Sequence, residues 1–172
     1  MKLLLLPLLM LFSFISAKEP LYIRLSNEIV GPYKKEVRKE RGYECTGGGG
    51  SLCNNVKVIT LTFTVRQVMH SQEEARRIII ELAEDLMARY NANEKIRPYL
   101  NDYPFGPRNT QILLLFNPKD PSSTTPLIST ANLMKGSISY SLASPCCGTR
   151  VGELPLETYD EAYKLVYGKA RQ

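Results

Sequence analysis

Apolar residues at steps of three and four predict a helix near the start of the chain. Between residues 21 and 41 this stripe consists of Tyr22, Leu25, Ile29, Tyr33 and Val37. Such spacing is typical of a helix with one buried face. Gly31 and Pro32 interrupt the stripe, so we expect either a kink or a second helix with Pro32 in its first turn, and we expect Gly42 to end it.

A strand and a second helix follow. The segment NVKVITLTFTV, residues 55–65, carries apolar or β-branched residues on both alternating faces, which predicts a central strand. Ser71 and Glu74 form a capping box, which predicts a helix start. The apolar face of this helix consists of Ala75, Ile79, Leu82, Leu86 and Tyr90. A second face carries charges of alternating sign: Glu73, Arg77, Glu81, Asp85 and Arg89.

The C-terminal half contains further strands and a closing helix. Residues 111–117, QILLLFN, are apolar and predict a buried strand. Residues 127–142 alternate as a strand does, and Lys135-Gly136 indicates either a hairpin turn or a bulge. The segment 156–168 predicts a helix that packs through Ala162, Leu165 and Val166. These elements predict an α+β fold, a two-layer sandwich whose small sheet of three or four mixed or antiparallel strands is covered by helices.

The first 17 residues, MKLLLLPLLMLFSFISA, have the pattern of a secretory signal peptide: Lys2, an apolar run and Ala17 at the cleavage position. The run is too short to span a bilayer, and no later segment is apolar enough. We therefore expect one α+β domain over residues 18–172, exported to the periplasm or the extracellular space, with no transmembrane segment in the mature chain. No Asn begins an N-x-Ser/Thr acceptor, which favours a bacterial origin.

The chain is mildly basic, with a formal net charge of +5. This favours loose association with anionic surfaces and does not indicate nucleic-acid binding, which calls for a clustered basic stripe. The first helix carries a basic face that could contact an anionic lipid or envelope polymer: Lys34, Lys35, Arg38, Lys39 and Arg41. The simpler interpretation is a solvated helix face, because Glu36 and Glu40 dilute the charge.

Four cysteines remain after removal of the leader: Cys45, Cys53, Cys146 and Cys147. An even number in an exported chain predicts disulfides. Adjacent cysteines lie about 3.8 Å apart at Cα, closer than an ordinary disulfide allows. We therefore predict two bridges between the 45/53 and 146/147 segments, with the glycines of ECTGGGGSLC supplying slack. A strained Cys146–Cys147 bond, which would be easily reduced, is the alternative.

No motif identifies a reaction, a cofactor or a metal site. The glycine run matches neither nucleotide-binding pattern and leads into a strand, and the cysteines lack C-x-x-C spacing. His70 is the sole histidine, in the position of an ordinary residue before a helix cap. Glu81, Glu84 and Asp85 could serve glycoside hydrolysis, but beside arginines they are more simply a salt-bridged face.

The segment between the second helix and the second strand is rich in aromatic residues and proline. Tyr99, Tyr103, Phe105 and Arg108 are residue types favoured in recognition patches. We consider this loop a possible binding surface. The alternative is that its aromatic rings cover the end of the helix and close the core.

The segments SQEEAR, residues 71–76, and RPYLNDYPF, residues 97–105, resemble small exported bacterial proteins of unknown function. The pattern is an acid-Ala-Arg helix start, then Arg-Pro-Tyr-Leu, then Tyr-Pro-Phe. The resemblance covers most of the mature chain, implies no activity and transfers no catalytic residue. The cysteines are not part of the pattern.

Together these observations predict an exported, non-enzymatic binding or envelope-associated module whose partner is a protein or an anionic envelope component. The alternatives are a small hydrolase with a carboxylate site and a redox-responsive protein that uses Cys146 and Cys147. An exposed aromatic loop would favour the first interpretation, and a deep pocket with converging acids the second.

Overall fold

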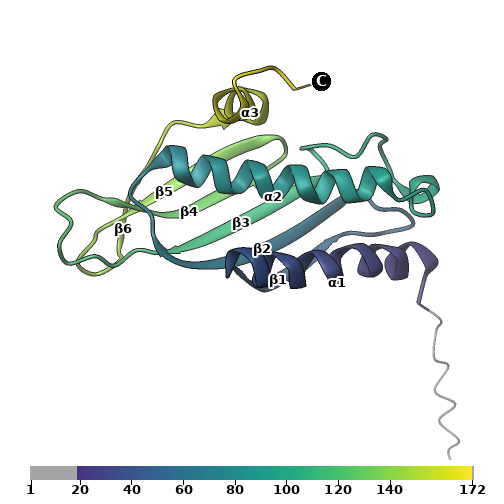
Figure 1. Ribbon diagram of the computed structural model, residues 1–172, viewed down its shortest axis with the longest axis horizontal. Coiled ribbons are helices and arrows are strands. Elements are labelled where there is room, and N and C mark those ends of the chain that lie inside the picture. The colour runs from purple at the N-terminus through teal and green to yellow at the C-terminus, as the bar shows by residue number, and fades with distance from the viewer. Residues whose placement is uncertain (1–18, 172) are drawn as a thin grey trace, which may run out of the picture.

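The computed structural model describes residues 19–171 and shows three α-helices against one face of a seven-stranded sheet (Figure 1). The helices are α1 (Leu21–Arg41), α2 (Gln72–Ala92) and α3 (Tyr159–Tyr167), with a short 3-10 turn η1 (Arg97–Tyr99). The strands are β1 (Glu44–Ser51), β2 (Val58–Val68), β3 (Thr110–Asn117), β4 (Leu127–Met134), β5 (Ser137–Ala143), β6 (Arg150–Glu153) and β7 (Glu157–Thr158). The α+β class is confirmed, and the sheet is larger than the predicted three or four strands.

The predicted leader, residues 1–17, lies outside the described residues. Within residues 19–171, no helix combines the length and the apolar character needed to cross a bilayer.

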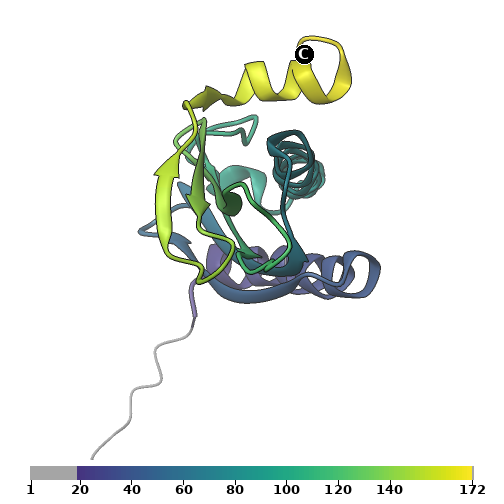
Figure 2. The same ribbon diagram turned by 90° about the vertical axis from the view of Figure 1, so that its left-hand side faces the viewer.

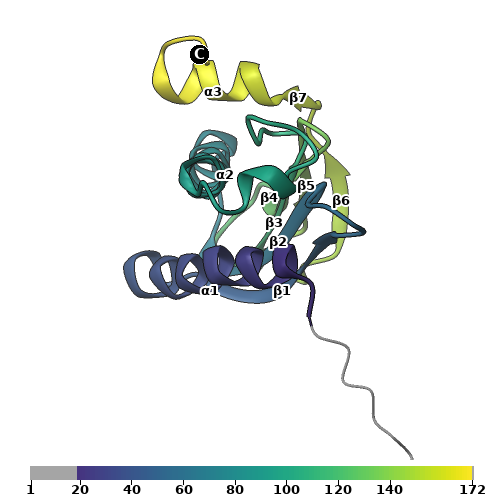
Figure 3. The same cartoon turned by 90° about the vertical axis from the view of Figure 1, so that its right-hand side faces the viewer.

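The sheet is built around one parallel pair. Strands follow the order β1-β2-β3-β4-β5-β6, with β7 beside β5. Only β2 and β3 run parallel, and α2 connects them across the face of the sheet; the other neighbouring strands are antiparallel. Viewed from the side, the helices lie together and leave the opposite face of the sheet uncovered (Figures 2 and 3).

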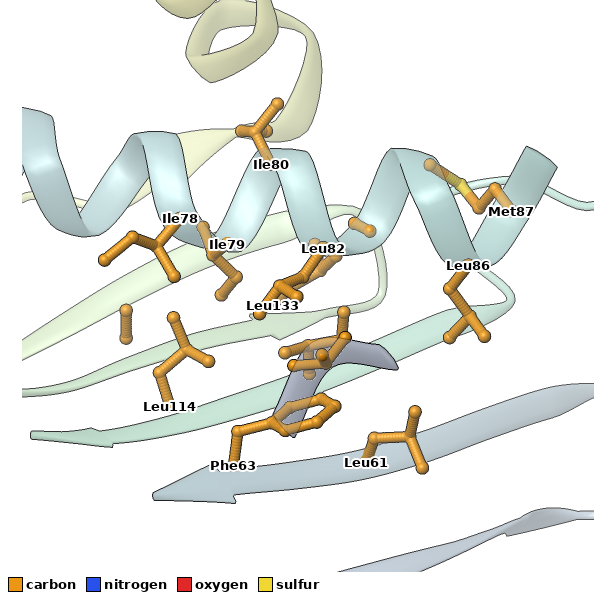
Figure 4. Packing of buried hydrophobic residues seen from close by; sticks show 14 of the residues in the cluster. Leu61, Phe63, Ile78, Ile79, Ile80, Leu82, Leu86, Met87, Leu114 and Leu133 are labelled. Atoms are coloured by element: carbon orange, nitrogen blue, oxygen red, sulfur yellow. The ribbon is translucent and has the colours of Figure 1, made fainter. Parts of the chain in front are cut away.

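Alternation along the strands creates the core. In β2 the buried residues Leu61 and Phe63 alternate with half-buried threonines, and in β3 Leu114 points to the same side. Leu82 and Leu86 of α2 meet them from above (Figure 4). Each such side chain contributes about 1.5–3 kcal/mol on burial, so this layer is the main source of stability.

Helix α1 is continuous through Pro32, so a second helix does not begin there. Its apolar stripe packs as expected: Tyr33 is fully buried, and its hydroxyl donates a hydrogen bond of 2.9 Å to the carbonyl oxygen of Leu82 in α2. Gly42 ends the helix in the left-handed conformation at φ 71°, as predicted for a glycine after the last turn.

The glycine run is a strand and not a slack connector. Gly47–Gly50 belong to β1, which pairs antiparallel with β2 at the edge of the sheet. A Cβ on Gly50 would overlap the carbonyl oxygen of Val58 in β2, whereas one on Gly49 would meet nothing. At Gly50, glycine therefore permits close approach of two backbones.

The cysteines are free thiols, and the two predicted bridges are wrong. Cys45 lies in β1, while Cys146 and Cys147 follow β5, four strand positions away, which is about 19 Å at the usual spacing. Cys53 lies beyond the other end of β1. Strand order therefore keeps the two cysteine segments apart.

Residues 127–142 form a hairpin. Lys135 and Gly136 both have positive φ, 54° and 79°, between β4 and β5, as a two-residue turn of the hairpin type requires. The closing helix α3 is present, but only Ala162 of its predicted stripe is buried, and Leu165 is exposed.

We expect Gly50→Ala to lower the free energy of unfolding by about 1–3 kcal/mol, because the added methyl group must displace the Val58 carbonyl. Urea denaturation measures the loss. Gly49→Ala is the matched control and should change stability by less than about 1 kcal/mol. Equal effects of the two substitutions would contradict the register of β1.

Candidate functional site

A cleft of about 620 Å³ lies where three segments distant in sequence meet. They are the 101–109 loop before β3, the β4–β5 turn and the start of α3 (Figure 1). Its polar lining includes Asp102, Arg108, Lys135, Thr158, Asp160 and Arg171. A space of this size is within the range of ligand pockets.

The loop wall of the cleft is fixed by hydrogen bonds. Buried Asn109 donates through its side-chain nitrogen to the Asp102 carboxylate at 2.8 Å and to the carbonyl oxygen of Lys57 at 3.0 Å. Its side-chain oxygen accepts from the backbone N–H of Gly106 at 3.1 Å. One asparagine thus ties the loop to itself and to the chain preceding β2.

Asp102 is held as a carboxylate. Hydrogen bonds from the side chains of Asn101 and Asn109 keep its pKa below the ordinary value, and the nearby Lys57 charge acts in the same direction. A carboxyl group in this environment is an acceptor at neutral pH and is poorly suited to donate a proton.

The start of α3 forms the second wall of the cleft, here called the helix wall, and a buried ion pair anchors it. Arg76 of α2 binds Glu157 of β7 through two hydrogen bonds, 2.8 and 2.5 Å long, and both side chains are nearly buried. Gln72 also binds Glu157. A paired, bidentate geometry is the form in which buried charges are tolerated, and here it fixes the strand that leads into the cleft.

Helix α3 begins at the cleft with a complete capping box. Thr158 accepts from the backbone N–H of Glu161, whose carboxylate accepts from the backbone N–H of Thr158. The next residue, Tyr159, is buried, and its hydroxyl donates to Glu84 of α2 at 2.8 Å. These contacts set the position of Asp160 in the wall.

The charges in the cleft are unequally compensated. Arg171 donates to Glu84 at 2.9 Å, and the Asp102 carboxylate is bound by two amides. Arg108 and Lys135 are exposed and form no ion pair with any other residue between 19 and 171. The cleft therefore presents two exposed cations that have no ion-pair partner within residues 19–171, and it also contains the carboxylates of Asp102 and Asp160.

The predicted aromatic loop is divided between core and surface. Phe105 is fully buried and stacks on Tyr90 with ring centroids 4.6 Å apart, so its placement in a binding surface is wrong. Tyr103 is 55% exposed, beneath the Arg97 guanidinium at 4.8 Å from the ring centre. Tyr99 is half-buried beside Tyr22. Arg108 alone of the four predicted residues lines the cleft.

The predicted basic face of α1 does not join the cleft. Lys35, Arg38 and Lys39 are exposed, but α1 and α3 lie on opposite sides of α2 (Figures 1 and 3). Arg41 is paired with Glu81 of α2 at 2.6 Å, and Lys34 is half-buried near Gly48. Part of this face therefore stabilises the helix pair.

The acids of α2 serve packing between helices. Arg89 binds Asp85 on its own helix and Glu36 on α1, and Glu81 binds Arg41. Glu84 holds Tyr159 and Arg171. They are structural partners, as the simpler interpretation of the sequence expected.

The remaining candidates stay apart from the cleft. His70 is exposed and lies 3.5 Å from Asp120. Between residues 19 and 171, no three or more His, Cys, Asp or Glu side chains gather as a metal site needs. The sequence did not predict the cleft; its only local signals were the Lys135-Gly136 turn and Arg108.

Comparisons with protein-family models, curated proteins and solved structures give no match to this chain.

Phe105 and Tyr103 should respond oppositely to truncation. We expect Phe105→Ala to lower the free energy of unfolding by about 3–5 kcal/mol, because it empties a buried site against Tyr90. Tyr103→Ala removes only an exposed ring under Arg97 and should cost less than about 1 kcal/mol. Guanidinium denaturation of both variants provides the comparison, and a large loss for Tyr103→Ala would place that ring in the core.

Proposed function

We propose that the protein is an exported, non-enzymatic binding module of the cell envelope, and that its cleft holds an anionic group of the partner. The observation that carries the proposal is that Arg108 and Lys135, two exposed cations without an ion-pair partner among residues 19–171, line the same preformed cleft. Export is supported by the leader pattern of residues 1–17.

Arg108 and Lys135 suit a carboxylate-bearing ligand. Arginine presents several N–H donors in a fixed fork, and lysine adds a compact charge on a flexible stem. Charge-assisted hydrogen bonds of this kind contribute about 1.5–3 kcal/mol each. Because the two residues belong to the 101–109 loop and the β4–β5 turn, a bound anionic group would bridge elements that are separate in sequence.

Rigidity of the walls also favours binding. The loop wall is fixed by Asn109 and the helix wall by the Arg76–Glu157 pair. A ligand that enters such a site does not have to order these segments, so less of its interaction energy is lost on association.

A hydrolase is less well supported by the same cleft. Asp102 and Asp160 both line it, and two carboxylates are the minimum for glycoside hydrolysis. One of the pair must then act as an acid with a raised pKa. The lowered pKa of Asp102 works against that role, because its amide partners favour the ionised form.

Isothermal titration calorimetry with a hexaglutamate peptide tests the binding proposal. We expect Arg108→Ala and Lys135→Ala each to weaken binding about tenfold, because each removes one charge-assisted contact. Arg38→Ala on the exposed face of α1 is the matched control and should leave the affinity unchanged. Absence of binding by the unaltered chain, or a loss confined to Arg38→Ala, would contradict the cleft as the anion site.

Asp102→Asn should have the opposite effect. The asparagine oxygen can still accept the bonds from Asn101 and Asn109, but one negative charge leaves the cleft wall. We therefore expect severalfold tighter binding of hexaglutamate at low ionic strength, with the gain shrinking as salt is added. Weaker binding would show that Asp102 contacts the ligand itself.

A further inference from the structure

The loop between β5 and β6 presents two adjacent thiols on a fixed backbone. Cys146 and Cys147 are both exposed. Ser144 donates its backbone N–H to the carbonyl oxygen of Thr149 at 2.8 Å, and Gly148 donates to the carbonyl oxygen of Ser144 at 2.8 Å. These bonds close a tight turn around the two cysteines.

A neighbouring segment supports the same turn. The backbone N–H of Asp120 donates to the carbonyl oxygen of Pro145 at 3.1 Å. Gly148 has φ 73°, and a Cβ there would lie 3.1 Å from the ring of Pro118. The thiols are therefore presented by a loop that is held from two sides.

Hydroxyl groups contact both sulfurs. The Ser144 hydroxyl lies 3.1 Å from the sulfur of Cys146, and the Thr149 hydroxyl lies 3.3 Å from the sulfur of Cys147. Hydrogen bonds from Thr149, and then from Cys146 and Ser144, lower the pKa of Cys147 to about 6. At neutral pH Cys147 is therefore mainly a thiolate, the reactive form in exchange.

Within one chain, each of these two thiols can form a disulfide only with the other. Cys45 lies four strand positions away in β1, and Cys53 lies beyond the far end of that strand. Any bond within one chain that involves Cys147 must therefore use Cys146.

We propose that Cys146 and Cys147 form a thiol–disulfide exchange site that reacts with a disulfide of a small molecule or partner. The Cys147 thiolate attacks one sulfur of that disulfide, whose S–S bond breaks; the other sulfur leaves with the electron pair and takes a proton from water. Cys146 then loses its proton to water and attacks the sulfur of Cys147, and the second partner sulfur leaves as a thiol. The partner gains two electrons, and the loop gains an eight-membered disulfide ring.

The Cys146–Cys147 disulfide is readily reduced, so the oxidised loop is itself an oxidant. Adjacent residues are about 3.8 Å apart at Cα, below the usual disulfide range, so the ring is strained and returns readily to the dithiol. The site therefore accepts a disulfide from a strongly oxidising partner and passes it on easily. This activity is independent of the cleft, because β5 separates the loop from the β4–β5 turn.

The test uses the full mature chain carrying Cys45→Ser and Cys53→Ser, with 5,5′-dithiobis(2-nitrobenzoate) as the disulfide probe. We expect release of two equivalents of the coloured thiol per chain and a protein product about 2 Da lighter with no adduct, since each S–S bond formed in the loop removes two hydrogens. Adding Cys146→Ser should stop the reaction at one equivalent, with a stable adduct on Cys147.

The pH dependence of the Cys146→Ser reaction provides the second readout. Its rate should rise through a midpoint well below pH 8.5 in the folded chain, because Thr149 still binds the sulfur of Cys147 and keeps its pKa low, and near pH 8.5 after unfolding in urea, where Cys147 has an ordinary thiol pKa. Circular dichroism checks that each variant is folded. A persistent adduct in the chain that retains both cysteines, or a folded midpoint near pH 8.5, would overturn the proposal.

Discussion

Burial of one face of the sheet is the constraint on which the structure depends. Alternate residues of β2 and β3 point toward α2 and are fully buried, while the residues between them are half-buried and carry no helix. Because the parallel pair needs a crossover, α2 must lie on that face, and α1 and α3 pack beside it. The ends of the strands then bring the loops together, and at one of these ends the cleft is formed.

The same constraint explains why covalent ties are absent from the fold. Two long-range disulfides would have contributed about 4–5 kcal/mol each in the chain-entropy model. Four buried core side chains give a gross stabilisation of similar size, at about 1.5–3 kcal/mol each. The core shown in Figure 4 contains more than that. The fold therefore does not depend on disulfides for stability, and two of the cysteines lie on an exposed loop.

Periodicity in the sequence predicted the elements that depend on one buried face. The stripe from Tyr22 to Val37, the apolar face of α2 and the alternation in β2 all appear where expected. Strand β1 was missed because four glycines have no side chains to alternate, so along Gly47–Gly50 its pairing with β2 rests on backbone contacts. The order of the strands and the distance between the cysteines cannot be obtained from the periodicity of apolar residues within single segments.

The candidate site was predictable only in part for a related reason. Phe105 and Tyr103 are similar residues in one loop, and Asn91 in α2, which binds the backbone of Phe105 at both its N–H and its carbonyl, decides which ring turns inward. The cleft joins segments more than 20 residues apart in sequence, and only Arg108 was predicted as a contact residue. A surface assembled by tertiary packing leaves little trace in the periodicity of any one segment.

The placement of segments at the two ends of the sheet is the central claim, and the distance between the exposed thiols of Cys53 and Cys147 tests it most directly. Cys53 lies near the start of β2, whereas Cys147 lies near Pro118, just beyond β3. The eight residues of β3 span about 26 Å at about 3.3 Å per residue. Nitroxides are attached to these two cysteines after Cys45→Ala and Cys146→Ala remove the other two thiols. Pulsed electron–electron double resonance should then give a distance of about 25 Å or more. A distance below about 15 Å would contradict the strand directions and the account built on them.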